Sequence, residues 1–309
     1  MRVRSGVVEV AGVRSPYIES GCRRAEDAVV FVHGNPGSSR DWAAAVRETG
    51  QFARALALDM PGFGRASKPR DFDYTVEGYA RHLAATLDHL GIRRAHLVLH
   101  DFGGPWGLAW AAAHPDAFAS VVLINIGVPL DYRWHAAARV WQTPVIGELA
   151  MALTTRPAFR LALRRGNPRG LPTAFVDRMY RDFDWGTRRA VLKLYRSARD
   201  VDGQGRRLAE AIRPLNRPAL VIWGRQDPYV PVELAERQRE VFPRMEIAVL
   251  EDSGHWPFMD NLESVARTLI PFLRDVTENG QYPRPATLSS NVDQPITTWN
   301  IDPEARSAR

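Results

Sequence analysis

Three polar residues at widely separated points of the chain have the types needed for nucleophilic hydrolysis. Asp101 ends the apolar run "LVLHD", Asp227 follows "LVIWGRQ", and His255 stands in "DSGHW". A nucleophile, an acid and a histidine in this chain order form one of the known arrangements of a catalytic triad. A lone aspartate at the end of a strand more often caps a helix, so the prediction depends on all three residues together.

An aspartate at the position where a serine usually stands changes the expected reaction. A carboxylate is already an anion at neutral pH, so Asp101 would displace a leaving group from an sp3 carbon directly and form an alkyl ester. His255, oriented by Asp227, would then activate a water molecule against the ester carbonyl. The resulting oxyanion needs hydrogen-bond donors, and we expect these to be the backbone N–H groups of Phe102 and Asn35.

The elements that must position these residues follow a strand–helix alternation. Apolar, β-branched runs that end in turn residues predict buried strands in "AVVFVHG", "ALALDM", "AHLVLHD" and "ASVVLINIG". Helical spacing occurs between them, from Tyr74 to Gly91 and from Pro105 to His114. The N-terminal stretches "GVVEVAG" and "SPYIES" predict a hairpin. Apolar strands separated by helices indicate an α/β fold with a mostly parallel sheet covered on both faces.

The segment 129–213 does not continue the alternation of strands and helices, because it has helical periodicity and no convincing strand. Its clearest predicted helices are "ARVWQTPVIGELAMAL" and "TRRAVLKLYRSA". Alternation resumes with "PALVIWGRQDPYVP" and "MEIAVLEDSGHWPF" and closes with a helix from Leu262 to Leu273. We therefore expect a core in two parts, 1–128 and 214–276. Between them, 129–213 would form a helical lid over the carboxyl ends of the strands, where ligands bind in such folds.

Composition limits the partners and the location of the protein. The chain has 309 residues, of which 45% are hydrophobic, enough for a large core. It has no run of about 18 apolar residues, so we expect no membrane span. The N-terminus lacks the apolar region of a signal peptide, and Cys22 is the single cysteine, which favours a cytoplasmic location. Residues 277–309 are polar and without period, which predicts a flexible tail.

Neither nucleic acid nor a cofactor is indicated. The net charge of +6 comes from arginines spread along the chain, without a recognition motif of basic and aromatic residues. The histidines show no metal-ligand spacing, and "GFGRAS" does not open a helix as a dinucleotide fingerprint would. We expect no metal, no cofactor and a small organic substrate, with the protein as a monomer or homodimer.

These motifs resemble the aspartate-nucleophile branch of the α/β-hydrolases, the epoxide hydrolases and haloalkane dehalogenases. The resemblance covers roughly Val29 to Val276 and rests on "HGNPGSSRDW", "DMPGFGRASKP", "HDFGGPWGLAWAAAHP", "WGRQDPYVP" and "EDSGHWPFMDN". It implies the α/β-hydrolase fold with an inserted helical cap, and the triad roles given above for the two aspartates and the histidine. It also implies that the turn at Asn35 forms the oxyanion hole, and that His33 and His100 support the site from outside it.

The two subfamilies differ in what helps the leaving group depart. A halide is a stable anion and needs only N–H donors, which in dehalogenases resemble an asparagine at Asn35 and a tryptophan directly after the nucleophile. Here that second position is Phe102, which has no donor. An epoxide leaves as a strongly basic alkoxide and needs an acid, which in epoxide hydrolases is a pair of lid tyrosines. Tyr195, in "LKLYRSARD", resembles the second of these.

The partner of Tyr195 is expected at the start of the lid, where the sequence leaves three candidates: Tyr132, Trp134 and Trp141. Tyr180, farther along the lid, is an outside candidate. Two residues favour the dehalogenases instead. Asn35 favours halide binding, and Leu99 stands two positions before the nucleophile, where epoxide hydrolases usually carry glycine. The balance of donors favours an epoxide hydrolase that forms vicinal diols, with a haloalkane dehalogenase as the alternative. A non-catalytic receptor on the same fold is a second alternative, whereas an esterase would use Asp101 poorly. A lid rich in tryptophan and leucine favours an apolar or aromatic substrate.

Overall fold

The computed structural model describes residues 2–278, which contain one eight-stranded sheet in the order β1-β2-β4-β3-β5-β6-β7-β8. The strands, in chain order, are β1 (Arg4–Val10), β2 (Val13–Ser20), β3 (Asp27–Val32), β4 (Arg54–Leu58), β5 (Arg94–His100), β6 (Phe118–Ile124), β7 (Ala219–Gly224) and β8 (Glu246–Leu250). The hairpin β1–β2 pairs antiparallel with β4, and the strands from β4 to β8 are parallel. The predicted α/β fold with a mostly parallel sheet is confirmed.

Burial explains why the central strands are continuous apolar runs. Every residue of β4, β6 and β7 is buried, as are the last six residues of β5. Helices on both faces of the sheet remove these strands from water, so no position along them favours a polar side chain. The edge strand β1 instead has several exposed residues.

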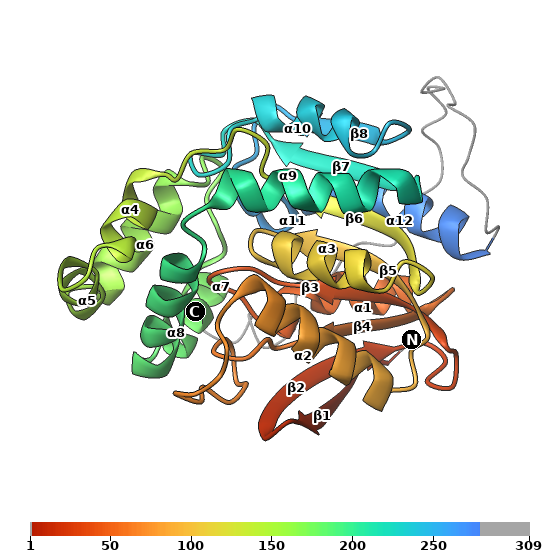
Figure 1. Cartoon of the computed structure of the whole chain (residues 1–309), viewed down its shortest axis with the longest axis horizontal. Coiled ribbons are helices and arrows are strands. Elements are labelled where there is room, and N and C mark those ends of the chain that lie inside the picture. Colours follow the sequence, from red (N-terminus) through yellow and green to blue (C-terminus); the bar gives the residue numbers. More distant parts are fainter. Residues whose placement is uncertain (1, 279–309) are drawn as a thin grey trace.

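Two groups of helices cover the sheet (Figure 1). Helices α2 (Val76–His89), α3 (Gly103–Ala113) and α9 (Val201–Ile212) lie side by side on one face. On the other face, α1 (Ala43–Thr49) packs against α12 (Leu262–Glu278). The short helices η1 (Ser39–Trp42), η2 (Arg213–Leu215), α10 (Glu233–Arg237), η3 (Gln238–Glu240) and α11 (Pro257–Asp260) lie in the connections.

The block between β6 and β7 consists of helices only, as the sequence predicts. Figure 1 shows α4 to α8 gathered beyond one end of the sheet. These helices are α4 (Ala136–Gln142), α5 (Ile146–Ala152), α6 (Arg156–Arg165), α7 (Thr173–Asp182) and α8 (Trp185–Ser197). The last helix of the expected lid, α9, instead runs back along the sheet and packs against α3. We use "lid" below for α4–α8.

Two helix boundaries differ from the sequence prediction. The single helix expected over "ARVWQTPVIGELAMAL" is divided into α4 and α5, because Pro144 has no N–H to continue α4 and disfavours helical backbone at Thr143. Helix α12 does not stop at Leu273 but continues to Glu278, since Val276 is buried against the core. The first two residues of the expected tail are thus helical, and residues 279–309 lie outside the described part. Within 2–278, no helix has the length and apolar character needed to cross a membrane.

Candidate active site

Asp101 lies in a tight turn between β5 and α3, at the carboxyl edge of the sheet. Its φ is +49°, in the left-handed region that side chains other than glycine seldom occupy. Small neighbours make this turn possible: a Cβ at Gly34 would collide with the Asp101 side chain, and one at Gly103 with the carbonyl of Val32. The strained backbone raises the carboxylate out of the strand and toward the lid, as expected for a nucleophile.

The three residues predicted as a triad lie together. Nε2 of His255 is 3.5 Å from Oδ2 of Asp101, and Nδ1 of His255 donates to Oδ2 of Asp227 at 2.7 Å. The imidazole is thus held between two carboxylates that are 126 positions apart in the sequence (227 − 101). This arrangement provides an anionic oxygen at the cavity and an oriented imidazole beside it.

Asp227 is fixed by donors that the sequence analysis did not identify. The Asn125 side chain donates to its Oδ2 at 2.7 Å, and the backbone N–H groups of Tyr229 and Val230 donate to Oδ1 at 2.8 and 3.1 Å. Asn125 also accepts the backbone N–H of Gly224 at 2.9 Å. The signal that could have revealed Asn125 is its place, a polar residue directly after the buried strand "SVVLI".

The loop that carries His255 is attached to the lid through its backbone. The N–H of His255 donates to the carbonyl of Gly166 at 3.0 Å, and the side chain of the fully buried Asn167 accepts the N–H of Trp256 at 3.0 Å. From the core side, Nε2 of His100 donates to the carbonyl of His255 at 2.8 Å. Since Gly166 and Asn167 directly follow α6, a movement of this part of the lid would act on the expected base.

The expected oxyanion loop contacts the carboxylate directly. The backbone N–H of Asn35 donates to Oδ1 of Asp101 at 2.6 Å, and the Asn35–Pro36 peptide bond is cis. His33 supports this loop: its Nδ1 donates to the carbonyl of Gly34 at 2.8 Å, and its Nε2 accepts the N–H of Met60 at 3.0 Å. His33 and His100 therefore hold backbone segments of the site, consistent with the supporting positions that the resemblance implies.

Electrostatic coupling separates the protonation states of the two central groups. Burial would raise the pKa of Asp101, but the hydrogen bond and charge of His255 lower it to about 2. Burial would lower the pKa of His255, but the charges of Asp227 and Asp101 and the bonds to both raise it to about 10. Burial lowers the pKa of His100 to about 3, which leaves this ring neutral. At neutral pH these shifts favour a carboxylate at Asp101 and an imidazolium at His255.

Tyr195, on α8, is buried beside the carboxylate and its ring meets that of Phe102 edge-on at 5.0 Å. Burial raises its pKa well above the ordinary value and the charge of Asp101 acts in the same direction, against a hydrogen bond from the Asn35 side chain. The Tyr195 hydroxyl therefore stays protonated and is a donor at the site.

Two of the three expected partners of Tyr195 use their donors elsewhere. The Tyr132 hydroxyl donates to the carbonyl of Tyr229 at 3.1 Å, and the indole of Trp134 donates to the carbonyl of Ala198 at 2.9 Å. Trp141 lines a cavity under the lid, and its ring lies edge-on to that of Tyr195 with 4.8 Å between the ring centroids. All three residues line cavities at the site, but the hydroxyl of Tyr132 and the indole of Trp134 are bound to backbone carbonyls.

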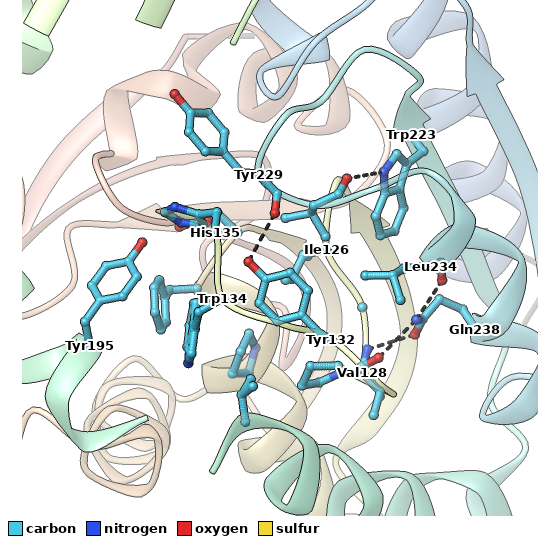
Figure 2. A pocket seen from close by; sticks show the side chains of 17 residues that line it. Ile126, Val128, Tyr132, Trp134, His135, Tyr195, Trp223, Tyr229, Leu234 and Gln238 are labelled. Carbon is cyan, nitrogen blue, oxygen red and sulfur yellow. Dashed lines mark hydrogen bonds between the residues drawn. The ribbon is translucent and has the colours of Figure 1, made fainter. Parts of the chain in front are cut away.

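His135, which the sequence analysis considered only for metal-ligand spacing, lines the cavities at the site, as Asp101 and Tyr195 do. Its Nδ1 caps α4 by accepting the N–H of Ala138 at 3.2 Å, so the proton of the neutral ring is on Nε2. Burial lowers the pKa of His135 to about 4, which keeps the ring neutral. Figure 2 shows its ring between Tyr229 and Tyr195, and its centroid lies 6.1 Å from that of Tyr195. The signal for His135 is its place directly before the helical run "AAARVWQ".

Two cavities meet at these residues. The lid cavity, of about 210 Å³, lies under the lid, and a smaller inner chamber, of about 50 Å³, lies toward β6 and β7. Four residues line both: Asp101, His135, Tyr195 and Tyr229. A molecule that reaches the carboxylate thus has space on two sides of it. Residues 2–278 contain no group of three or more histidine, cysteine or acidic side chains placed to hold a metal ion.

Comparison with known proteins gives the same fold and several chemistries. The alpha/beta hydrolase fold family matches residues 27–262. A haloalkane dehalogenase of Agrobacterium fabrum (strain C58) is 44% identical over 103 residues, which is 32% of this chain and 34% of that protein. The 2-hydroxy-6-oxononadienedioate/2-hydroxy-6-oxononatrienedioate hydrolase of Burkholderia vietnamiensis is 28% identical over 85% of this chain and 91% of its own length.

Among solved structures, the epoxide hydrolase CorEH superimposes with a TM-score of 0.75 over 89% of this chain and 100% of that one, at 18% identity. This likeness concerns the fold. The comparisons therefore support a hydrolase of the alpha/beta hydrolase fold family, and they leave the bond that is cleaved to the geometry of the site.

Proposed function

Because this chain belongs to the alpha/beta hydrolase fold family, we propose that it hydrolyses epoxides to vicinal diols through an ester on Asp101. One observation carries the proposal: Tyr195 and His135, whose hydroxyl and Nε2 carry protons, line the two cavities that Asp101 also lines. An epoxide that opens leaves an alkoxide, which needs a proton in the transition state. A halide needs none, so a phenolic acid at this position favours the epoxide.

In the first step, a carboxylate oxygen of Asp101 attacks one ring carbon, and the bond from that carbon to the ring oxygen breaks. Tyr195 transfers its proton to the ring oxygen, while His135 donates a hydrogen bond to the same oxygen. The phenolate so formed takes up, through water, the proton that His255 held. Each proton is thus accounted for, and His255 becomes neutral when a base is required.

Loss of charge on Asp101 makes this proton release favourable. In the resting site, the carboxylate of Asp101 is one of the two groups that raise the pKa of His255. An ester at Asp101 is neutral, so only Asp227 remains to stabilise the imidazolium, which is buried. The pKa of His255 should therefore fall once the ester has formed.

In the second step, neutral His255 removes a proton from water, and the hydroxide attacks the carbonyl carbon of the ester. The backbone N–H groups of Asn35 and Phe102 would stabilise the oxyanion, for which the present bond from Asn35 to Oδ1 is suitable. Collapse of this intermediate breaks the bond between the carbonyl carbon and the alkyl oxygen, and that oxygen takes the remaining proton of the attacking water. The diol then leaves, and the carboxylate of Asp101 and the imidazolium of His255 are restored. Because the attacked carbon belongs to the protein, one oxygen of water enters Asp101.

A haloalkane dehalogenase is the second candidate, favoured by the 44% identity over 103 residues with the Agrobacterium enzyme. A halide would need two N–H donors beside the carboxylate. The Asn35 side chain and Nε2 of His135 are available, whereas the Trp134 indole is bound to a carbonyl and Phe102 has no donor. This chemistry would leave Tyr195 without a proton-transfer role.

The test is a single turnover in heavy-oxygen water, with styrene oxide and 1-bromobutane as parallel substrates. We expect diol from the epoxide, label in the peptide that contains Asp101, and little halide from the bromoalkane. Halide release that exceeds diol formation would select the dehalogenase. Binding of both compounds without turnover would instead favour a receptor, and label only in the diol would exclude the ester.

A further inference from the structure

We propose that the substrate is an internal epoxide with two apolar arms, one bulky arm in the lid cavity and one slim, unbranched arm in the inner chamber. The inference rests on the proposed function and names the class of substrate for the same site. Because Asp101 and both donors line the two cavities at once, the reacting ring would lie at their junction. Substituents on the two ring carbons then point into different cavities.

The lid cavity suits the bulky arm. Its walls come from the lid helices and include Met151, Phe159, Leu163 and Val191, which are all buried. Its volume of about 210 Å³ is about four times that of the inner chamber, which has about 50 Å³. An aryl ring or a branched chain therefore fits without displacing the lid.

The inner chamber is the smaller of the two cavities, with about 50 Å³. Away from Asp101 and the two donors, the polar groups of its wall bind the backbone (Figure 2), so this part of the chamber presents apolar surfaces. Gln238 binds both the N–H and the carbonyl of Val128, and the Trp223 indole donates to the carbonyl of Val230. Neither side chain is free to replace the hydrogen bonds with water that a polar arm would lose on entering the chamber.

The walls of the chamber limit the width of the substrate arm that it can hold. Phe102, Pro105, Pro129, Trp134 and Val201 line both the chamber and an outer groove of about 390 Å³ on α3 and α9. A branched or aryl arm would have to widen the chamber against buried side chains such as Trp223 and Val230.

The experiment compares three epoxides on the intact enzyme: styrene oxide, trans-β-methylstyrene oxide and trans-stilbene oxide. These carry the same aryl arm with a second arm of hydrogen, methyl or phenyl. We expect the highest kcat/KM with the methyl arm and a value at least about tenfold lower with the second phenyl, a discrimination typical of a close-fitting apolar pocket. In Leu234→Ala or Val230→Ala, which widen the chamber, the ratio of stilbene oxide to methylstyrene oxide should rise about tenfold.

Leu163→Ala is the matched control for Leu234→Ala, since it removes the same side-chain atoms but from the lid cavity. It should leave the ratio of stilbene oxide to methylstyrene oxide unchanged. Equal rates for stilbene oxide and methylstyrene oxide in the unaltered enzyme would overturn the inference. So would a preference for styrene oxide, or an equal rise of the ratio in Leu163→Ala. In each of those outcomes epoxides are still hydrolysed, whereas the absence of diol from all three compounds would refute the proposed function itself.

Discussion

Nε2 of His255 lies 3.5 Å from Oδ2 of Asp101, so the expected base and the expected nucleophile share one charge-coupled pair. This contact, with the bond from His255 to Asp227, raises the pKa of the imidazole to about 10. The same contact lowers the pKa of Asp101 to about 2. The contact thus keeps Asp101 as the carboxylate that the attack requires. Formation of the ester should then lower the pKa of His255, so that the ring becomes the neutral base that the second step requires.

The coupling predicts how His255 titrates. In the resting protein it should stay protonated through neutral pH and lose its proton near pH 10, because its folded pKa is raised. In Asp101→Asn, which removes one negative charge as the ester would, the pKa should fall by more than one unit. NMR titration of the His255 ring nitrogens measures both values. Equal pKa values in the two proteins would show that Asp101 does not control the base.

Loss of the base should trap the ester. His255→Gln keeps the carboxylate of Asp101 but cannot activate water, so an epoxide should add its full mass to the protein and turn over only slowly. Mass spectrometry of the intact protein and its peptides detects the adduct and assigns it to Asp101. Asp101→Asn with the same epoxide is the control and should gain no mass. An adduct on any other residue would contradict the mechanism.

The effect of removing a donor near the lid should depend on whether that donor faces the cavity or binds a backbone carbonyl. Tyr195→Phe and His135→Phe each remove a donor at the cavity, so kcat for epoxides should fall by about 10²–10⁴. Tyr132→Phe removes a hydroxyl that binds the Tyr229 carbonyl, so it should cost about 1 kcal/mol of stability with little change in kcat. Steady-state rates and urea unfolding measure the two effects. A larger loss of kcat in Tyr132→Phe than in Tyr195→Phe would reverse the assignment.

Asn125 should act through Asp227. Its side chain donates to Asp227 and accepts from Gly224 in the fully buried interior. Asn125→Ala leaves the N–H of Gly224 without this acceptor and Asp227 with one donor fewer, so we expect a loss of about 2 kcal/mol in the free energy of unfolding. Asn125→Asp places a second negative charge beside Asp227 and should raise the pKa of His255 further in NMR titration. An unchanged titration in this variant would make the role of Asn125 purely structural.

Much of the site follows from short segments of sequence. The strands before Asp101, Asn125 and Asp227 are apolar runs whose pattern is set by burial on both faces, and each is followed by turn residues. Parallel strands place their carboxyl ends at one edge, so groups that follow them come together without further information. The division of the predicted helix at Pro144 was equally local, since proline disfavours helix in its own vicinity.

Which lid residue presents a proton to the cavity could not be read from those segments. Tyr132, Trp134 and His135 are neighbours in sequence, and their chemistry alone makes each a plausible donor. The carbonyls of Tyr229 and Ala198, from remote segments, engage the first two, while the start of α4 fixes the third. The sequence by itself determined which groups end the strands, because burial and turn propensity act over a few residues. Only the tertiary structure decided where each donor points, because a hydrogen bond is directional and its partner lies far along the chain.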